Sequence, residues 1–300
     1  MASTDRKPLL NSHWLNGWNL FWLLAGPICI MKIAVTLRTG LATPADVSSL
    51  IGFSVRWAVP LIFLIVAIPA LQTLFPGPVP SWLMRNRKQI GLVFALTMAW
   101  QGLFIFLIST RYRGYYFEDI HLFRDELEGS IGYVFLALMV LTSFDFGRKR
   151  LSPKEWKLLH MSGMYFLWAY ALSTYWWAKF YYEGPEPHDR LFYALGFSAM
   201  ALRIVAWRKR RLNEYRRAGV EFTIDGYRRL LAGLLIGAGL ALAVTGRLWG
   251  GPYSDFTLGP AWSARLELWL PFWPFDPFIS LLMFGLGVAC ITPARPVTTH

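Results

Sequence analysis

The sequence is poor in cysteine and in charge, and it lacks the short motifs that mark most soluble enzymes. Its two cysteines, Cys29 and Cys290, both lie inside apolar runs, which argues against a disulfide framework or a cysteine-based metal site. No Gly-rich phosphate loop is present, so no NAD or flavin site is expected in this chain. No Ser/His/Asp arrangement, paired carboxylates or metal-spaced His/Asp/Glu cluster falls on one helix face. Hydrolase and intramembrane protease functions are therefore not expected.

Long apolar runs dominate what is present. Hydrophobic residues make up 55% of the 300 residues and aromatic residues 17%. Many of the rings stand at the ends of the apolar runs, where amphipathic aromatic side chains prefer the headgroup layer of a bilayer. The runs have the length that a bilayer core requires. They predict an all-α polytopic transmembrane helical bundle of about eight helices, at residues 18–37, 57–75, 90–109, 130–146, 158–178, 191–207, 230–248 and 272–291.

The distribution of basic residues predicts the orientation of these helices. The net charge is +12, and the basic residues gather in alternate loops, as the positive-inside bias requires, so no nucleic-acid partner is needed to explain them. One side of the predicted bundle collects most of them: Arg6, Lys7, Arg85, Arg87, Lys88, Arg148, Lys149, Arg150, Lys154, Lys157, Arg208, Lys209, Arg210, Arg211, Arg216, Arg217, Arg228, Arg229 and Arg295. This side is assigned to the cytoplasm. The expected location is the bacterial inner membrane, with both termini cytoplasmic.

The chain shows no internal repeat and no linker long enough to separate soluble domains. We expect a cytoplasmic N-terminal segment (1–17), one transmembrane helical domain (18–292) and a cytoplasmic C-terminal tail (293–300). No cleavable signal peptide is evident, so the first apolar run is expected to be retained. The largest expected cytoplasmic feature is a loop over residues 208–229.

Two stretches carry more than generic membrane-helix character. The first is a basic turn that opens the predicted third helix and includes Arg87, Lys88, Ile90, Gly91 and Leu92. The second joins the predicted fourth and fifth helices and includes Thr142, Ser143, Leu151, Trp156, Leu159 and His160. Over about residues 82–180 these stretches resemble the ferric-reductase-like transmembrane family, the haem-binding core shared by ferric reductases, NADPH oxidases and the membrane subunit of the bacterial periplasmic methionine sulfoxide reductase system. The matching family patterns are "R-R-x-L-G-L", a "T-S" pair, and "L-G-x-x-W-x-x-L-H".

The resemblance implies a bundle that grips b-type haem through histidine pairs, and this chain departs from that pattern. Ser152 replaces the glycine of the motif, and the Leu151 to Trp156 spacing is one residue longer. The predicted third helix has Met98 and Gln101 where the family has histidine. His160 remains, but Ser173 and Thr174 stand where a second histidine is expected.

Three roles stay open for His160. It hydrogen-bonds a neighbour as a structural residue, or it ligates haem iron together with Met98, or it ligates haem whose other axial position is open or filled by a partner subunit. A His/Met pair tends to raise the reduction potential. Methionine in an apolar helix is usually flexible packing, however. The predicted helix ends also place the two residues at different depths in the membrane.

Two further basic residues, Lys32 and Arg203, fall inside or near the ends of predicted helices, where charge is costly. Both are expected to snorkel toward the interface. For Lys32, pairing with an acidic group such as Asp46 is an alternative, and a functional role stays open for both residues.

Three functions remain open on the sequence. The first is a degenerate, haem-poor relative with a structural or assembly role in a membrane complex. The second is a transmembrane electron carrier with one b-type haem bound through His160, passing electrons from a cytoplasmic reductase or quinol to an acceptor on the outer side. The third is a small transporter, for which Pro27, Pro60 and Pro69 are expected helix breakers but form no matched pattern.

Overall fold

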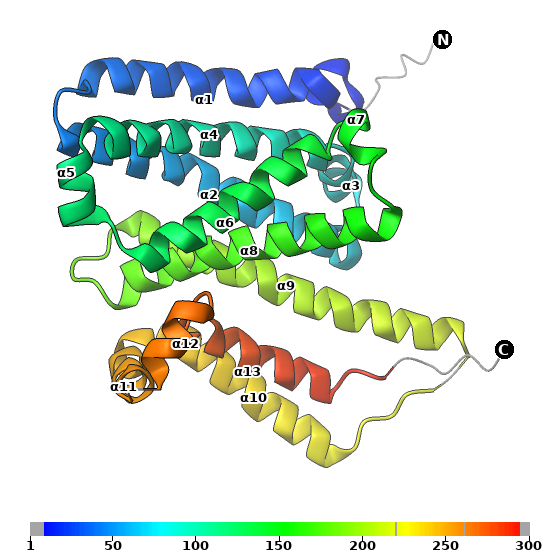
Figure 1. The fold of residues 1–300 in the computed structure, drawn as a ribbon. Coiled ribbons are helices and arrows are strands. Elements are labelled where there is room, and N and C mark those ends of the chain that lie inside the picture. The colour runs from blue at the N-terminus through cyan, green and yellow to red at the C-terminus, as the bar shows by residue number, and fades with distance from the viewer. Residues whose placement is uncertain (1–8, 220, 261, 295–300) are drawn as a thin grey trace, which may run out of the picture. The chain divides into compact units, whose positions relative to one another are not determined.

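The computed structural model describes residues 9–219, 221–260 and 262–294, and within these ranges the protein is built from helices without strands (Figure 1). The predicted N-terminal segment (1–17) and C-terminal tail (293–300) each lie partly outside the described residues. Two short 3₁₀ turns, Leu9–Asn11 and His13–Leu15, precede the first long helix. The all-helical fold class is confirmed.

Five helices are long and apolar enough to cross a membrane, judged by length and composition over the described residues. They are α1 (Gly17–Thr39), α2 (Pro44–Leu74), α4 (Arg87–Arg111), α9 (Pro187–Arg217) and α10 (Gly226–Val244). Three more helices lie at the other predicted positions: α6 (Phe123–Leu141), α8 (Pro153–Phe180) and α13 (Asp276–Cys290). A helix therefore stands at every predicted position, but membrane spanning by the last three stays a prediction.

Several predicted helix ends are wrong. Helix α2 begins at Pro44 instead of residue 57, and α9 runs on to Arg217, so the predicted cytoplasmic loop over residues 208–229 is largely helical. Helix α13 begins at Asp276 instead of residue 272, because the prolines before it exclude a regular helix. The expected proline breaks are also wrong, since α1 continues through Pro27 and α2 continues through both of its internal prolines.

The starts of α2, α8 and α9 share one local device. Each has a residue with a polar side chain, then proline, then an acidic residue two positions further on, in the sequences Thr43–Asp46, Ser152–Glu155 and Glu186–Asp189. At the first two starts the acidic side chain accepts the backbone N–H of the cap residue, and the cap hydroxyl accepts the N–H of the acidic residue. The third is a capping box as well. Proline fits because the first helical N–H has no intrahelical partner.

The described chain divides into two compact units. Unit 1 holds the residues up to Ile65 together with Gly77–Leu167, and unit 2 holds Val66–Pro76 and the residues from Trp168 onward. Helices α2 and α8 thus contribute residues to both units.

In unit 1, α1 packs beside α4 (Figure 1). An apolar cluster of Val47, Leu50, Phe104, Ile108 and Tyr116 joins α2, α4 and the short π-helix Tyr116–Ile120. The remaining short helices of this unit are α3 (Pro78–Arg85), α5 (Arg113–Tyr115) and α7 (Asp145–Arg148).

The polar ends of unit 1 meet through named contacts. The Trp82 indole N–H donates to the carbonyl of Leu15 at 2.7 Å, and Trp18 stacks on Phe144 with ring centroids 6.4 Å apart. These contacts bring the start of α1 and the segments before α4 and after α6 to one end of the unit.

In unit 2, α13 packs against α9 and, very closely, against α10. Two glycines allow the close approach. A Cβ on Gly239 of α10 would lie 2.7 Å from the backbone of Ser280 and of Phe284, and a Cβ on Gly287 of α13 would lie 2.9 Å from the carbonyl of Ala232. Small residues at such contacts are typical of membrane helix pairs. The short helices α11 (Gly246–Leu258) and α12 (Ser263–Trp269) complete this unit.

Candidate functional site

Three motif residues that lie apart in the sequence meet in the hairpin between α6 and α8. The Nε2 atom of His160 lies 2.9 Å from the hydroxyl of Thr142. The indole N–H of Trp156 donates to the carbonyl of the same Thr142 at 3.0 Å, and the Trp156 ring stacks on the His160 ring with centroids 4.2 Å apart. Trp156 and His160 are four residues apart on α8, which places their side chains on one helix face.

The hydrogen bonds of Thr142 indicate where the His160 proton lies. Thr142 donates its only hydroxyl hydrogen to the carbonyl of Leu138 at 2.7 Å, four residues back along the chain. The hydroxyl can then only accept from His160, so the imidazole carries its hydrogen on Nε2. Nε2 is the nitrogen that points toward α6, and in this arrangement it is a donor without a free lone pair.

A close approach of the backbone closes the hairpin between α6 and α8. Thr142 is buried, and Gly147 of α7 packs so tightly against the carbonyl of Leu141 that a side chain there would collide with it. The Arg148 guanidinium lies over the Trp156 ring, 5.0 Å from its centroid, and donates to the carbonyl of Leu151 at 3.1 Å. The Thr142, Trp156 and His160 side chains, called the hairpin clasp below, therefore sit in a turn that is itself constrained.

Met98 does not join the hairpin clasp. It lies half-buried on α4, and its backbone carbonyl lies 3.2 Å from the Tyr133 hydroxyl, which also reaches the Gln101 side chain at 3.2 Å. Gln101, the other residue that replaces a family histidine, is thus part of a contact between α4 and α6. Neither Met98 nor His160 lines the two hollows of unit 1 that are described below.

In this arrangement the Nε2 atom of His160 is engaged by Thr142 and is not free to ligate haem iron. Nε2 of His160 would have to give up its hydrogen bond to Thr142 before it could ligate an iron atom, and Trp156 covers one face of the imidazole ring. Arg87, the first residue of the basic motif, donates to the sulfur of Met164 on α8 at 2.8 Å. Ligation by His160 and Met98 stays a prediction.

The other described histidines have polar partners. His121 lies 2.6 Å from the carboxylate of Glu126, and His188 lies 3.2 Å from each of Glu186 and Asp189. His13 lies 2.8 Å from the Asn19 amide, and His300 lies outside the described residues. Over the part of the chain that is described, no three His, Cys, Asp or Glu side chains form a group that could hold a metal.

Lys32 is the most deeply buried cation in the described chain, at 1% exposure. Its ammonium group lies 3.4 Å from the carbonyls of Ser54 on α2 and Thr97 on α4. Asp46 instead accepts the N–H of Thr43 in the capping turn of α2. Both expectations for Lys32, snorkelling and pairing with Asp46, are therefore wrong: backbone carbonyls of two neighbouring helices hold the amine inside unit 1.

Basic residues of α9 in unit 2 bind backbone carbonyls in the same way. Arg203 is half-buried and donates to the carbonyl of Val66 at 3.2 Å, and its snorkelling stays a prediction. Arg208 donates to Ile291 at 3.2 Å and Lys209 to Leu74 at 3.1 Å. The last two acceptors lie at helix C-terminal ends, where cations are favoured. These contacts explain why α9 continues beyond the predicted end.

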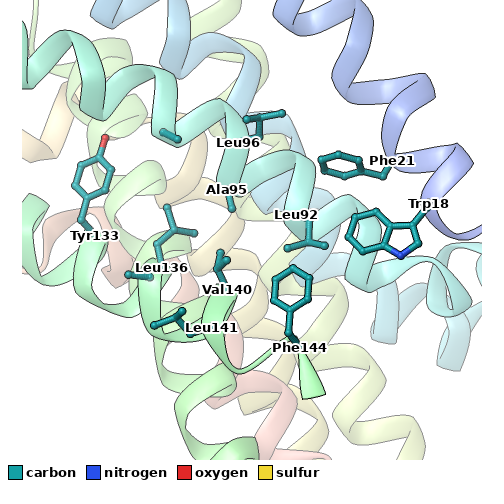
Figure 2. Close-up of a pocket in the computed structure, with 12 residues that line it drawn as sticks. Trp18, Phe21, Leu92, Ala95, Leu96, Tyr133, Leu136, Val140, Leu141 and Phe144 are labelled. Atoms are coloured by element: carbon teal, nitrogen blue, oxygen red, sulfur yellow. The ribbon is translucent and has the colours of Figure 1, made fainter. Parts of the chain in front are cut away.

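One feature of unit 1 is not predicted from the sequence: an apolar groove of about 530 Å³ between α1, α4 and α6 (Figure 2). Its lining residues come from three segments that are distant in the sequence. The only feature of the sequence that points to the groove is the aromatic residues near the ends of the apolar runs, Trp18, Phe21 and Phe144 among them. A second, polar hollow of about 590 Å³ adjoins it at Trp18 and includes Arg85.

No protein-family model, no curated protein and no solved structure matches this chain.

Proposed function

We propose that the chain is an integral membrane protein of the bacterial inner membrane, a haem-poor relative of the ferric-reductase-like family with a structural or assembly role in a membrane complex. The observation that carries the structural role is the hairpin clasp. His160, the one histidine that remains of the motif, donates its Nε2 hydrogen to Thr142 and stacks one face of its ring on Trp156. His160 therefore holds α8 against the end of α6.

The proposed topology has eight spans with both termini in the cytoplasm. Five apolar helices of sufficient length support membrane insertion. In unit 1 the basic residues around the start of α4 and around α7 lie at one end, since Lys88 stands over the Phe144 ring at 5.1 Å. This grouping is what the positive-inside bias requires of cytoplasmic loops.

Single-cysteine labelling tests this topology. In a background with Cys29→Ala and Cys290→Ala, a membrane-impermeant maleimide applied to intact spheroplasts should label Glu183→Cys, between α8 and α9. It should label Arg150→Cys, between α7 and α8, only after permeabilisation. The reverse pattern would overturn the orientation, and labelling of both sites from outside would overturn the span count between them.

The structural role is tested on the full chain extracted from bacterial membranes in mild detergent. Native mass spectrometry of the tagged chain should find a second membrane subunit at a fixed ratio. Thr142→Val, which removes the acceptor of His160, should reduce that ratio, whereas Ser109→Ala on α4, whose hydroxyl donates to the carbonyl of Phe106 in its own helix, should leave it unchanged. A chain that is homogeneous without a partner subunit and carries haem would contradict the proposal and favour the electron carrier.

A further inference from the structure

The apolar groove of unit 1 has the lining of a hydrocarbon site. Side chains of α4 (Leu92, Ala95, Leu96) and of α6 (Leu136, Val140) form its walls, and Figure 2 shows Trp18 and Phe21 of α1 facing Phe144 at one end. Tyr133 is the only lining residue with a polar side-chain atom besides the indole N–H of Trp18, and its hydroxyl is turned to Met98 and Gln101. A volume of about 530 Å³ is in the range of small-molecule sites.

The hollow on the other side of Trp18 has the opposite character. It is lined by polar residues before and at the start of α1, including His13, Asn16 and Asn19, and by Arg85 at the end of α3. Because Trp18 lines both spaces, a ligand with an apolar part and a polar part can occupy the two together. The polar hollow lies at the basic end of unit 1, next to the residues that open α4.

Arg85 gives the polar hollow its positive charge. Its Nε donates to the Asn16 side chain at 3.0 Å, and its Nη2 reaches the carbonyl of Leu10 at 3.0 Å and the Asn11 side chain at 3.3 Å. These partners are neutral, and within the described chain no carboxylate pairs with Arg85 and its Nη1 group has no protein acceptor. The guanidinium is thus held in place by neutral groups while its charge remains available to an anion.

The size of the groove argues against a partner helix. Its walls on α4 run from Leu92 to Ala99, which is roughly 10 Å of helix at about 1.5 Å per residue. A transmembrane helix of a partner would need a track of about 30 Å. A neutral ring such as a quinone would leave the Arg85 charge without a counterpart. The headgroup-proximal part of one acyl chain, together with an anionic headgroup, matches both spaces.

We propose that these two spaces form a binding site for an anionic glycerophospholipid, with one acyl chain in the apolar groove and the phosphate at Arg85. The inference rests on the proposed membrane location and orientation, which put Arg85 in the cytoplasmic leaflet. The bound lipid fills the space between α1, α4 and α6 and ties the segment before α1 to the end of α3.

The test is native mass spectrometry of the full chain in a neutral detergent, titrated with phosphatidylglycerol and with phosphatidylcholine of identical acyl chains. One phosphatidylglycerol should bind per chain, about tenfold more tightly than phosphatidylcholine, as one charge-assisted contact predicts. Arg85→Gln should remove this preference. His13→Glu should also remove it by placing a negative charge in the polar hollow without touching the Arg85 contacts.

Matched variants separate the two parts of the site. Ala95→Trp should fill the groove and weaken both lipids at least tenfold, whereas Ala34→Trp, at an exposed position of α1 outside the groove, should change neither. Arg150→Gln, an exposed cation away from the hollow, should keep the preference for phosphatidylglycerol.

Three results would overturn the lipid site: equal binding of the two lipids, an unchanged preference in both Arg85→Gln and His13→Glu, or a co-purified quinone or subunit that Ala95→Trp displaces in place of lipid. Membrane fractionation of the same cells is scored separately. A chain found in the soluble fraction would refute the proposed membrane location, whereas a membrane-bound chain that fails the titration would refute the lipid site alone.

Discussion

The α6–α8 hairpin of unit 1 and the α10–α13 pair of unit 2 hold helices together in different ways. The hairpin uses polar side chains, with His160 donating to Thr142 and Trp156 covering the imidazole. The α10–α13 pair uses the absence of side chains, with Gly239 and Gly287 letting backbone meet backbone. The polar contact fixes how the two helices are oriented and contributes modestly to the free energy of unfolding. The glycine contact gives close packing that leaves no room for an added atom.

The largest expected effect comes from filling the glycine contact. Gly239→Leu should lower the free energy of unfolding by about 3 kcal/mol or more, because the new side chain begins 2.7 Å from the backbone of α13. Thermal unfolding in detergent measures it. Gly237→Leu is the matched control on the same helix, since no atom lies within 4 Å of its Cβ, and it should stay within about 0.5 kcal/mol of the parent. Equal losses in the two variants would show that close packing at Gly239 does not hold α10 against α13.

The hairpin clasp should cost less to break. Thr142→Val removes the acceptor of the His160 N–H and should lower the free energy of unfolding by about 2 kcal/mol, the typical cost of a buried donor left unpaired. A double-mutant cycle with His160→Phe isolates the contact and should give a coupling of about 1 kcal/mol. Strict additivity of the two substitutions would mean that the hydrogen bond does not hold the hairpin.

Lys32 is a second polar contact of unit 1, but its carbonyl partners offset little of the free-energy cost of burying its charge. Its amine has two long contacts to carbonyls and, in the described chain, no carboxylate partner within ion-pair distance. Lys32→Met, which keeps the length of the side chain and removes the charge, should therefore raise the free energy of unfolding by about 1 kcal/mol. A loss of stability instead would show that the amine is a structural tie comparable with the hairpin clasp.

The smallest expected effect lies at the start of α8. Hydrogen bonds from Ser152 lower the pKa of the exposed Glu155 carboxyl below its ordinary value. Since the folded state favours the charged form, the gain in stability is present at neutral pH and is lost as the pH falls through the lowered pKa. Glu155→Gln should thus lower the melting temperature slightly at pH 7 and not at pH 3. Glu183→Gln, outside any cap, is the control, and a difference that persists in acid would contradict the capping role.

The sequence predicts the helical class and the position of eight helices because apolar length is a local property. It fails at helix ends that depend on distant partners, as where Arg208 and Lys209 extend α9 by binding Ile291 and Leu74. It also misplaces Lys32, whose carbonyl partners come from two other helices.

For the candidate site, the motif points to Thr142, Trp156 and His160 but not to their mutual contacts. The pairing of His160 with Thr142 depends on how α6 and α8 are joined through α7. The apolar groove depends on three segments meeting, which no periodicity in one segment reports.

We propose that His160 joins α6 to α8 and does not ligate haem. An ultraviolet-visible spectrum, with and without dithionite, on detergent-purified protein expressed with ample haem supply tests it most directly, with His160→Ala measured alongside. We expect no Soret band in either protein. A b-type haem spectrum that is present in the parent and absent from His160→Ala would contradict it.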